Sequence, residues 1–149
     1  MKQYIGTKII KAEPAYRVDG KVFVKANIVP CGYKIEDGYK VVYPDGYESW
    51  SPKDVFEASY RETSGMSFGL AIEAAKMGNK IARAGWNGKN QYVELASCIS
   101  YKNGAGEIVN VGHDAIGNKA LAFVGTSGVQ MGWLASQADM LADDWKIFG

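Results

Sequence analysis

The second half of the chain contains five short runs of β-favouring residues, and this feature limits the possible folds more than any other. Glycine, asparagine, serine and aspartate residues separate the runs, as they do where turns join neighbouring strands. The runs are residues 80–84, 91–96, 107–111, 120–124 and 129–134. Strands this short, joined in this way, predict a small antiparallel sheet.

A helix is predicted just before these strands. Its apolar residues recur at the i, i+3, i+4, i+7 spacing of an amphipathic helix. They are Phe68, Ala71, Ile72 and Ala75. Ser67 is placed to cap the helix and Gly78 to end it, so we expect the helix over residues 68–77.

The end of the chain predicts a short helix and a last strand. Ser136 and Asp139 form a cap-like pair, which is typical of a helix start. Residues 145–148 can add one more strand to the sheet. The expected fold class is therefore α+β, with a small antiparallel β-sheet packed with short helices.

A short polar break at residues 62–65 divides the sequence into two parts. We place a boundary there, with a small β-rich N-terminal module over residues 1–62 and an α+β core domain over residues 66–149. A segment of about 62 residues is marginal for independent folding, so we expect the module to depend on contacts with the rest of the chain.

The N-terminal module is expected to contain strands and a hairpin. Residues 4–10 and 39–43 are rich in β-favouring residues. The Pro-Asp-Gly turn at residues 44–46 returns the chain through residues 47–50. This arrangement predicts an antiparallel hairpin at that point.

The module is expected to end in a helix. Ser51 is positioned to cap it, and Pro52 suits the first helical position because its missing N–H group is not needed there. Asp54 favours the helix dipole in the first turn. We expect this helix to end near Tyr60.

Composition and charge exclude several functional classes. The chain has 149 residues, of which 47% are hydrophobic and 22% charged, as in a soluble globular protein. Its 17 basic residues nearly balance its 16 acidic residues, and this balance holds in both parts of the chain. Binding to DNA or RNA is therefore not expected, because that binding depends on a basic surface that releases counterions.

The two cysteines do not predict a metal site. Cys31 and Cys98 lie far apart, and the chain has one histidine, so a structural zinc site is not expected. We expect both cysteines to be reduced, buried thiols. No apolar run has the length of a signal peptide or of a membrane span. The sequence thus predicts a cytoplasmic protein without a cofactor.

The tryptophans are the main candidates for ligand contacts. Trp86 precedes an Asn-Gly pair at residues 87–88, which supplies positive φ for a tight turn and places the indole near a loop tip. The alternative is a ring that covers one end of the sheet. Alternation along a strand sends Trp133 and Leu134 to opposite faces, with Leu134 expected in the core. Trp145 is expected to pack.

Three polar residues accompany the tryptophans. The Arg83 guanidinium could pair with a phosphate, and the backbone N–H groups at the Ser136 helix start could receive an anion. Asp139 is expected to cap that helix in preference to catalysing a reaction. Its carboxylate could also accept hydrogen bonds from a ribose or from an adenine amino group.

His113 and Asp114 form the one His–acid pair in the sequence. A catalytic triad would also need a nearby serine or cysteine, and no Gly-x-Ser-x-Gly motif indicates one. A structural or solvent-facing role is therefore favoured for His113. No catalytic residue is predicted.

Three segments together resemble the phage Thoeris anti-defence family, the second type described. They are Met-Ser-Phe-Gly at residues 66–69, Arg-Ala-Gly-Trp-Asn-Gly at residues 83–88, and the two-tryptophan segment at residues 133–145. The resemblance covers residues 66–148. It implies a small α+β fold that assembles as a homotetramer, with ligand pockets formed where subunits meet.

Members of this family sequester the cyclised ADP-ribose signal of bacterial TIR-domain immune enzymes. The resemblance implies binding of glycocyclic ADP-ribose without cleavage, and some members also bind cyclic dinucleotides at a separate site. The implied location is the cytoplasm of the infected host. The implied ligand-binding residues are Phe68, Trp86, Asn87, Trp133 and Asp139, together with Arg83 and Ser136.

Two other classes of function stay open at this point. One is a hydrolase of a nucleotide signal that uses His113 and a carboxylate. The other is a structural or adaptor protein whose N-terminal module binds a peptide or a host factor. The leading prediction is a non-catalytic sponge, because the sequence offers planar and polar groups but no convincing nucleophile, base or metal set.

Overall fold

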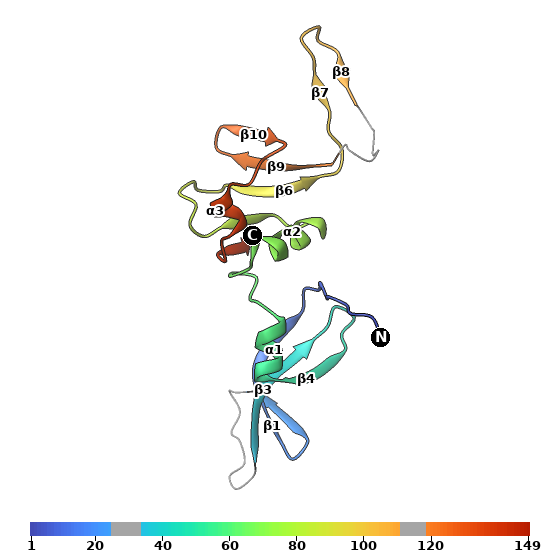
Figure 1. Ribbon diagram of the computed structural model, residues 1–149, viewed down its shortest axis with the longest axis vertical. Coiled ribbons are helices and arrows are strands. Elements are labelled where there is room, and N and C mark those ends of the chain that lie inside the picture. The colour runs from blue at the N-terminus through green and yellow to red at the C-terminus, as the bar shows by residue number, and fades with distance from the viewer. Residues whose placement is uncertain (25–33, 111–118) are drawn as a thin grey trace. The chain divides into compact units, whose positions relative to one another are not determined.

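The protein divides into two compact units, Met1–Arg61 and Glu62–Gly149. The computed structural model describes residues 1–24, 34–110 and 119–149 (Figure 1). Both units are built on antiparallel sheets with short helices, and the expected α+β class is confirmed. Within the described part of the chain, no helix is long and apolar enough to cross a membrane.

The N-terminal unit is a four-stranded antiparallel sheet in the order β2-β1-β3-β4, followed by one helix. The elements are β1 (Lys11–Val18), β2 (Lys21–Val24), β3 (Ile35–Val42), β4 (Glu48–Pro52) and α1 (Lys53–Ser59). Asp19 and Gly20 join β1 to β2 with φ values of 48° and 73°. Two central residues with positive φ are typical of the turn that matches the twist of a hairpin.

The predicted β3–β4 hairpin is confirmed, but two expectations for this unit are wrong. Residues 1–10, all of which the structure describes, form no strand. Lys11 pairs with Val42, the last residue of β3, so the residues before Lys11 lie beyond the end of the partner strand. Ser51 does not cap α1, because its backbone pairs with Tyr39 inside the sheet and Pro52 takes the cap position without a side-chain bond.

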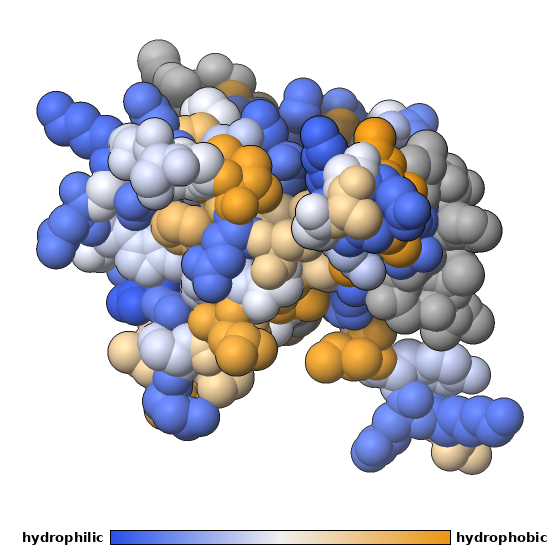
Figure 2. All heavy atoms as spheres, turned by 90° about the horizontal axis from the view of Figure 1, so that it is seen from above, coloured by the Kyte–Doolittle hydropathy of each residue, from blue (hydrophilic) through white to orange (hydrophobic). Residues whose placement is uncertain are grey.

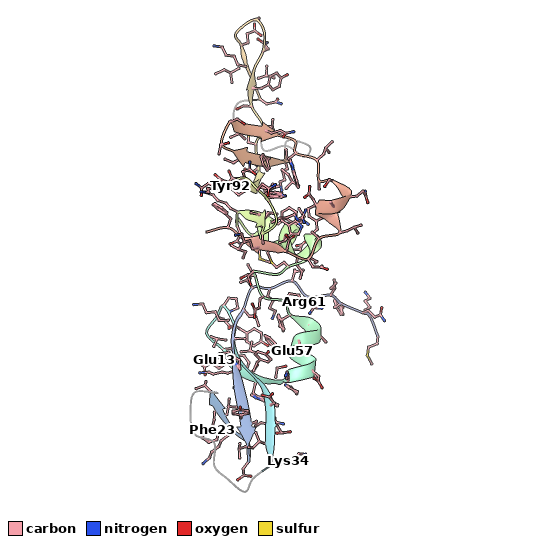
Figure 3. The ribbon with its side chains drawn as sticks, turned by 90° about the vertical axis from the view of Figure 1, so that its left-hand side faces the viewer. Glu13, Phe23, Lys34, Glu57, Arg61 and Tyr92 are labelled. Carbon is pink, nitrogen blue, oxygen red and sulfur yellow. The ribbon has the colours of Figure 1, made fainter. Side chains whose placement is uncertain are left out.

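Aromatic stacking joins α1 to its sheet. The Phe56 ring stacks on Tyr39 at 4.1 Å between ring centres, and Tyr60 stacks on Phe56 at 4.9 Å. The Tyr39 hydroxyl also donates a hydrogen bond to Glu57, which lies on α1 in Figure 3. Because side chains alternate along β3 and β4, Trp50 lies on the face of the sheet opposite Tyr39.

The C-terminal unit is a five-stranded antiparallel sheet in the order β10-β9-β6-β5-β11. Its strands are β5 (Ile81–Arg83), β6 (Tyr92–Ala96), β9 (Ala120–Gly125), β10 (Gly128–Met131) and β11 (Trp145–Ile147), and its helices are α2 (Phe68–Lys76) and α3 (Gln137–Met140). The buried core joins α2 to the sheet through Ala71, Ala74, Ala75, Ile81, Val93 and Trp145.

Local signals placed α2 correctly. The Ser67 side chain accepts a hydrogen bond from the Leu70 N–H group, as an N-cap does. Ala71 and Ala75 are buried, as the helical spacing requires. Gly78 follows the helix with φ of +93°, a conformation that favours glycine.

One predicted strand of the sheet lies elsewhere. Residues 107–111 were expected in the main sheet, but their described part forms β8 (Ile108–Val109), which pairs with β7 (Tyr101–Lys102). Figure 1 shows this two-stranded hairpin projecting from the sheet of its own unit. The C-terminal strand β11 takes the remaining edge of the sheet by pairing with β5.

Candidate functional site

Four aromatic rings meet at one end of the C-terminal unit, around Trp86. The Trp86 ring lies edge-to-face against Trp145 at 5.4 Å, Phe123 at 5.5 Å and Trp133 at 6.0 Å, measured between ring centres. Phe68, the first residue of α2, contacts the same cluster through Trp145 at 5.4 Å. The structure thus brings together three of the predicted ligand-binding residues.

Burial separates the packing ring from the candidate ligand contacts. Trp145 is 0% exposed, so its predicted packing role is confirmed. Trp86 and Trp133 are half-buried and pack against the same core from its edge. These two rings therefore combine packing with partial access to solvent.

The tryptophan at position 133 corrects a prediction. We expected Leu134 in the core, but Leu134 is 88% exposed, whereas Trp133 stacks near Phe123 with an angle of 22° between the rings. The expectation relied on strand alternation through residue 134, but β10 ends at Met131 and Gly132 has φ of +74°. This left-handed residue ends the alternation before Trp133.

The segment of residues 84–88, here named the Trp86 turn, connects β5 to the loop before β6. Positive φ occurs at Asn90 instead of the predicted Asn-Gly pair. A Cβ atom at Gly88 would meet the end of the Gln91 side chain, which would have to move. Asn87 is exposed on this turn.

Asp139 is the polar centre of the site. It completes the predicted capping box of α3: its backbone N–H donates to the Ser136 hydroxyl, and its Oδ2 atom accepts from the Ser136 backbone N–H at 3.1 Å. Its Oδ1 atom accepts from Arg83 Nη1 at 3.0 Å and from Trp86 Nε1 at 3.3 Å. Its main-chain oxygen accepts from Trp145 Nε1 at 2.8 Å. The capping role is confirmed, and the same residue connects both indoles to α3.

Arg83 bridges two carboxylates. Its Nε atom donates to Asp144 Oδ1 at 2.8 Å, and its Nη1 atom donates to Asp139. The Arg83 and Asp139 side chains are 20% and 14% exposed, so this pair is better shielded from water than an ordinary surface ion pair. A phosphate that pairs with Arg83 would therefore share a cation already engaged by two aspartates.

The electrostatics keep both carboxylates charged. Burial alone would raise the pKa of Asp139, but hydrogen bonds from Arg83, Ser136 and Trp86 leave it below its ordinary value. The hydrogen bond from Arg83, with one from the Gly85 N–H group, lowers the pKa of Asp144. Neither group is thus suited to donate a proton near neutral pH, which is the task of a general acid.

Two contributors to the site were not among the predicted binding residues. Phe123 carries no signal beyond its place in a predicted strand. Asp144 stands in an Asp-Asp-Trp sequence directly before the buried Trp145, and nothing in this local sequence marks it as part of a binding site. Its contacts with Arg83 and Gly85 depend on residues about sixty positions away, and local patterns do not reveal them.

Other predicted groups add little to the site as described. Within residues 1–24, 34–110 and 119–149, no group of three His, Cys, Asp or Glu residues could hold a metal ion. His113, Asp114 and Cys31 lie outside the described residues. Cys98 is a free, half-buried thiol that donates to the Asn110 carbonyl at 3.6 Å.

A separate cavity of about 250 Å³ lies between α2 and the sheet. It is lined mainly by apolar side chains, with two lysines. The lining residues are Ile72, Ala75, Lys76, Leu95, Lys119, Ala120 and Leu121. This cavity shares no residue with the aromatic and carboxylate cluster.

The C-terminal unit is a small α+β domain in which a shielded Arg–Asp pair supports a cluster of tryptophans. Residues 66–148 match the family model of the Thoeris anti-defense 2-like domain. The match covers more than half of the chain, and the chain belongs to this family. Over 87 residues it is 39% identical to Thoeris anti-defense 2 of Bacillus phage SP01. The aligned region covers 55% of this chain and 93% of that relative.

Family membership gives the chain a phage anti-defence role. It is consistent with a non-catalytic protein. The matched region starts at Met66, so the N-terminal unit lies outside the family domain.

Proposed function

We propose that the protein is a sponge that binds a cyclic ADP-ribose-type immune signal and lowers its free concentration without cleaving it. The observation that carries this proposal is the half-buried pair of Trp86 and Trp133 beside Asp139. Planar rings can stack on a base, and each such contact contributes about 1–3 kcal/mol. Family membership in an anti-defence group supports the same function.

The polar groups of the site suit recognition more than chemistry. Breaking a glycosidic or phosphodiester bond requires an activated water or nucleophile. The two carboxylates nearest the tryptophans both receive hydrogen bonds from Arg83, and both have a lowered pKa. Asp139 is held in place to orient the indoles, and Asn87 on the exposed turn is free to contact a ligand in our proposal.

We infer further that the ligand pocket is shared between subunits of a homotetramer. The tryptophan rings are only partly covered within one chain, and large apolar side chains next to α3 remain exposed. Leu134 is 88% exposed and Leu141 is 78% exposed. Covering apolar surface contributes about 25 cal/mol per Å², so a second subunit over these leucines would both stabilise the assembly and wall the pocket.

Other apolar side chains also reach the surface of the protein. Figure 2 shows them among hydrophilic ones on the face seen from above. Val129 and Met131 on the edge strand β10 are 62% and 44% exposed. Scattered exposure of this kind is ordinary for a soluble surface and assigns no interface by itself.

The test is recovery of intact ligand. The protein is incubated with glycocyclic ADP-ribose, the affinity is measured by calorimetry, and the supernatant after heat denaturation is analysed by mass spectrometry. We expect stoichiometric release of unchanged ligand that again activates its immune effector. Light scattering on the same sample should give a tetramer.

Each alternative predicts a different result in this experiment. Substoichiometric amounts of a hydrolase would convert the cyclic ligand into linear product, and the amount of product would grow with time. An adaptor protein would bind neither cyclic ADP-ribose isomers nor cyclic dinucleotides. A monomer that still binds the ligand tightly would contradict the shared pocket while leaving the sponge intact.

A further inference from the structure

We propose that Asp144 is a positioning residue that holds the Trp86 turn, and through it the Trp86 ring, in the geometry that binds ligand. This inference rests on the proposed function, because it concerns the same site. Among the predicted ligand-binding residues that the structure describes, Asp144 forms its side-chain hydrogen bond with Arg83, and its other side-chain bond is with Gly85.

Three hydrogen bonds accepted by one residue fix the start of the turn. Asp144 Oδ1 accepts from Arg83 Nε at 2.8 Å, and Asp144 Oδ2 accepts from the Gly85 N–H group at 2.8 Å. The main-chain oxygen of Asp144 accepts from the Ala84 N–H group at 3.0 Å. Three consecutive residues immediately before Trp86 are thereby anchored to a single residue at the start of β11.

The remaining bonds of the turn are weaker by geometry. The Trp86 N–H group donates to the Arg83 carbonyl at 3.3 Å, and the indole Nε1 atom donates to Asp139 Oδ1 at 3.3 Å. Both distances lie beyond the usual 2.7–3.2 Å range of an N–H···O bond. Among the described residues, the short polar contacts that fix this turn therefore come from Asp144.

Asp144 also limits the position of Arg83. The guanidinium now divides its donors between Asp144 and Asp139. Without Asp144, the guanidinium is free to turn fully toward Asp139, as an arginine fork does with a single carboxylate. Arg83 and the Trp86 indole N–H already share Oδ1 of Asp139, and a closer approach of the guanidinium would displace the indole.

The Asp144 side chain acts through its hydrogen bonds and not through apolar packing. It is 35% exposed and is not part of the apolar core. Asp143, the preceding residue, is exposed and shares the same charge and the same segment. Asp143→Ala is thus a matched control for the loss of one carboxylate at this position.

The binding experiment is a double-mutant cycle with glycocyclic ADP-ribose as the probe. We expect Asp144→Ala to weaken binding roughly ten- to hundredfold, as the loss of charge-assisted hydrogen bonds does, and Asp143→Ala to leave it unchanged. In a Trp86→Ala background, Asp144→Ala should add less than about a threefold loss, because its effect passes through Trp86. A full additional loss in that background would overturn the proposal.

A second measurement needs no ligand. The edge-to-face indoles at 5.4 and 6.0 Å should give an exciton band in the far-ultraviolet circular dichroism spectrum. Trp86→Phe defines the spectrum without the contribution of Trp86. We expect Asp144→Ala to move the spectrum toward that of Trp86→Phe, and an unchanged band would overturn the proposal.

The two measurements separate this inference from the proposed function. If the wild-type protein binds no probe but Asp144→Ala loses the exciton band, the sponge function fails and the positioning of the turn stands. If Asp144→Ala does not fold, Asp144→Asn replaces it, because its amide oxygen still accepts one bond while Arg83 loses one of its two carboxylate partners. Asp144→Asn with wild-type affinity and spectrum would overturn the proposal.

Discussion

Each unit places an arginine and a carboxylate beside a tryptophan, but the two arrangements differ in shielding. In the N-terminal unit, Arg17 donates to Glu36 at 2.7 Å, and its guanidinium lies 4.1 Å above the Trp50 ring. The Arg17 and Glu36 side chains are 40% and 41% exposed. Trp50 Nε1 is buried and has no hydrogen-bond partner within the described residues.

In the C-terminal unit, the carboxylate lies between the cation and the indole. Asp139 accepts from Arg83 and from Trp86, with side-chain exposures of 14% and 20% for the ion pair. The indole N–H groups of Trp86 and Trp145 both donate to Asp139, one to its carboxylate and the other to its main-chain oxygen. Shielding from water and the carboxylate shared by Arg83 and Trp86 make this cluster stronger and more directional than the surface pair.

The difference indicates where the chain holds a precise geometry. On the N-terminal sheet, the Trp50 ring lies on Gly38, where a Cβ atom would come within 2.6 Å of the ring. That contact covers the sheet but orients no group toward a ligand. In the C-terminal unit, the same residue types fix the half-buried Trp86 indole beside the buried Trp145 indole, as a binding site requires.

The largest expected effect is the loss of a core ring in the C-terminal unit. Trp145→Ala should reduce the free energy of unfolding by about 3–5 kcal/mol, because it empties the largest fully buried site and removes the N–H group that donates to the Asp139 carbonyl. Trp50→Ala, in the N-terminal unit, should cost less, because its ring is only half-buried. Urea unfolding followed by circular dichroism measures both, and equal losses would remove the contrast between the units.

Ligand affinity should separate the tryptophans by unit. Trp86→Ala and Trp133→Ala should each weaken binding by roughly 5- to 150-fold, the equivalent of one lost stacking contact. Trp50→Ala should leave the affinity unchanged. Calorimetry on folded variants is the measurement, with Trp86→Phe as the variant that best preserves packing. Unchanged affinity in both folded alanine variants would return Trp86 and Trp133 to a packing role.

Acid should destabilise the C-terminal unit through Asp139 and Asp144. Hydrogen bonds lower the pKa of both groups in the folded state, so the folded state binds their protons more weakly than the unfolded chain does. Their stabilising effect is complete above the unfolded-state pKa of about 3.9 and is lost as the pH falls through the folded-state values.

Urea midpoints measured from neutral to acidic pH test this dependence. The double variant with Asp139→Asn and Asp144→Asn should have lower stability at neutral pH and a flatter acid limb. Arg17 also lowers the pKa of Glu36 through a hydrogen bond, so Glu36→Gln provides the comparison in the exposed pair. An acid limb that the double variant does not change would assign the loss of stability to other carboxylates.

The smallest expected effect on binding comes from removing the N-terminal module. A fragment of residues 63–149 should keep most of the ligand affinity, because the family match begins at Met66 and the relative from Bacillus phage SP01 is 93% covered by the matched region. The fragment keeps the Thr63 carbonyl that accepts from Ile147. A soluble fragment that does not bind would show that residues 1–62 help to build the pocket.

Local sequence signals determined α2, α3 and the β3–β4 hairpin of this protein. Ser67 and the Ser136–Asp139 pair cap their helices through bonds between residues three positions apart. The β3–β4 hairpin depends on the turn between its two strands. Such structures form from neighbours in the sequence, so residue type and spacing are enough to predict them.

Only the tertiary structure decided which strand became an edge, that Trp133 and not Leu134 turns toward the core, and that Asp144 joins Asp139 at the site. Gly132 turns Trp133 inward and leaves Leu134 exposed. The bonds from Arg83 to Asp139 and Asp144 span 56 and 61 residues. Contacts of that range depend on how β5, α3 and β11 pack together, and this packing is set by the burial of the whole core instead of by the local pattern around any one residue.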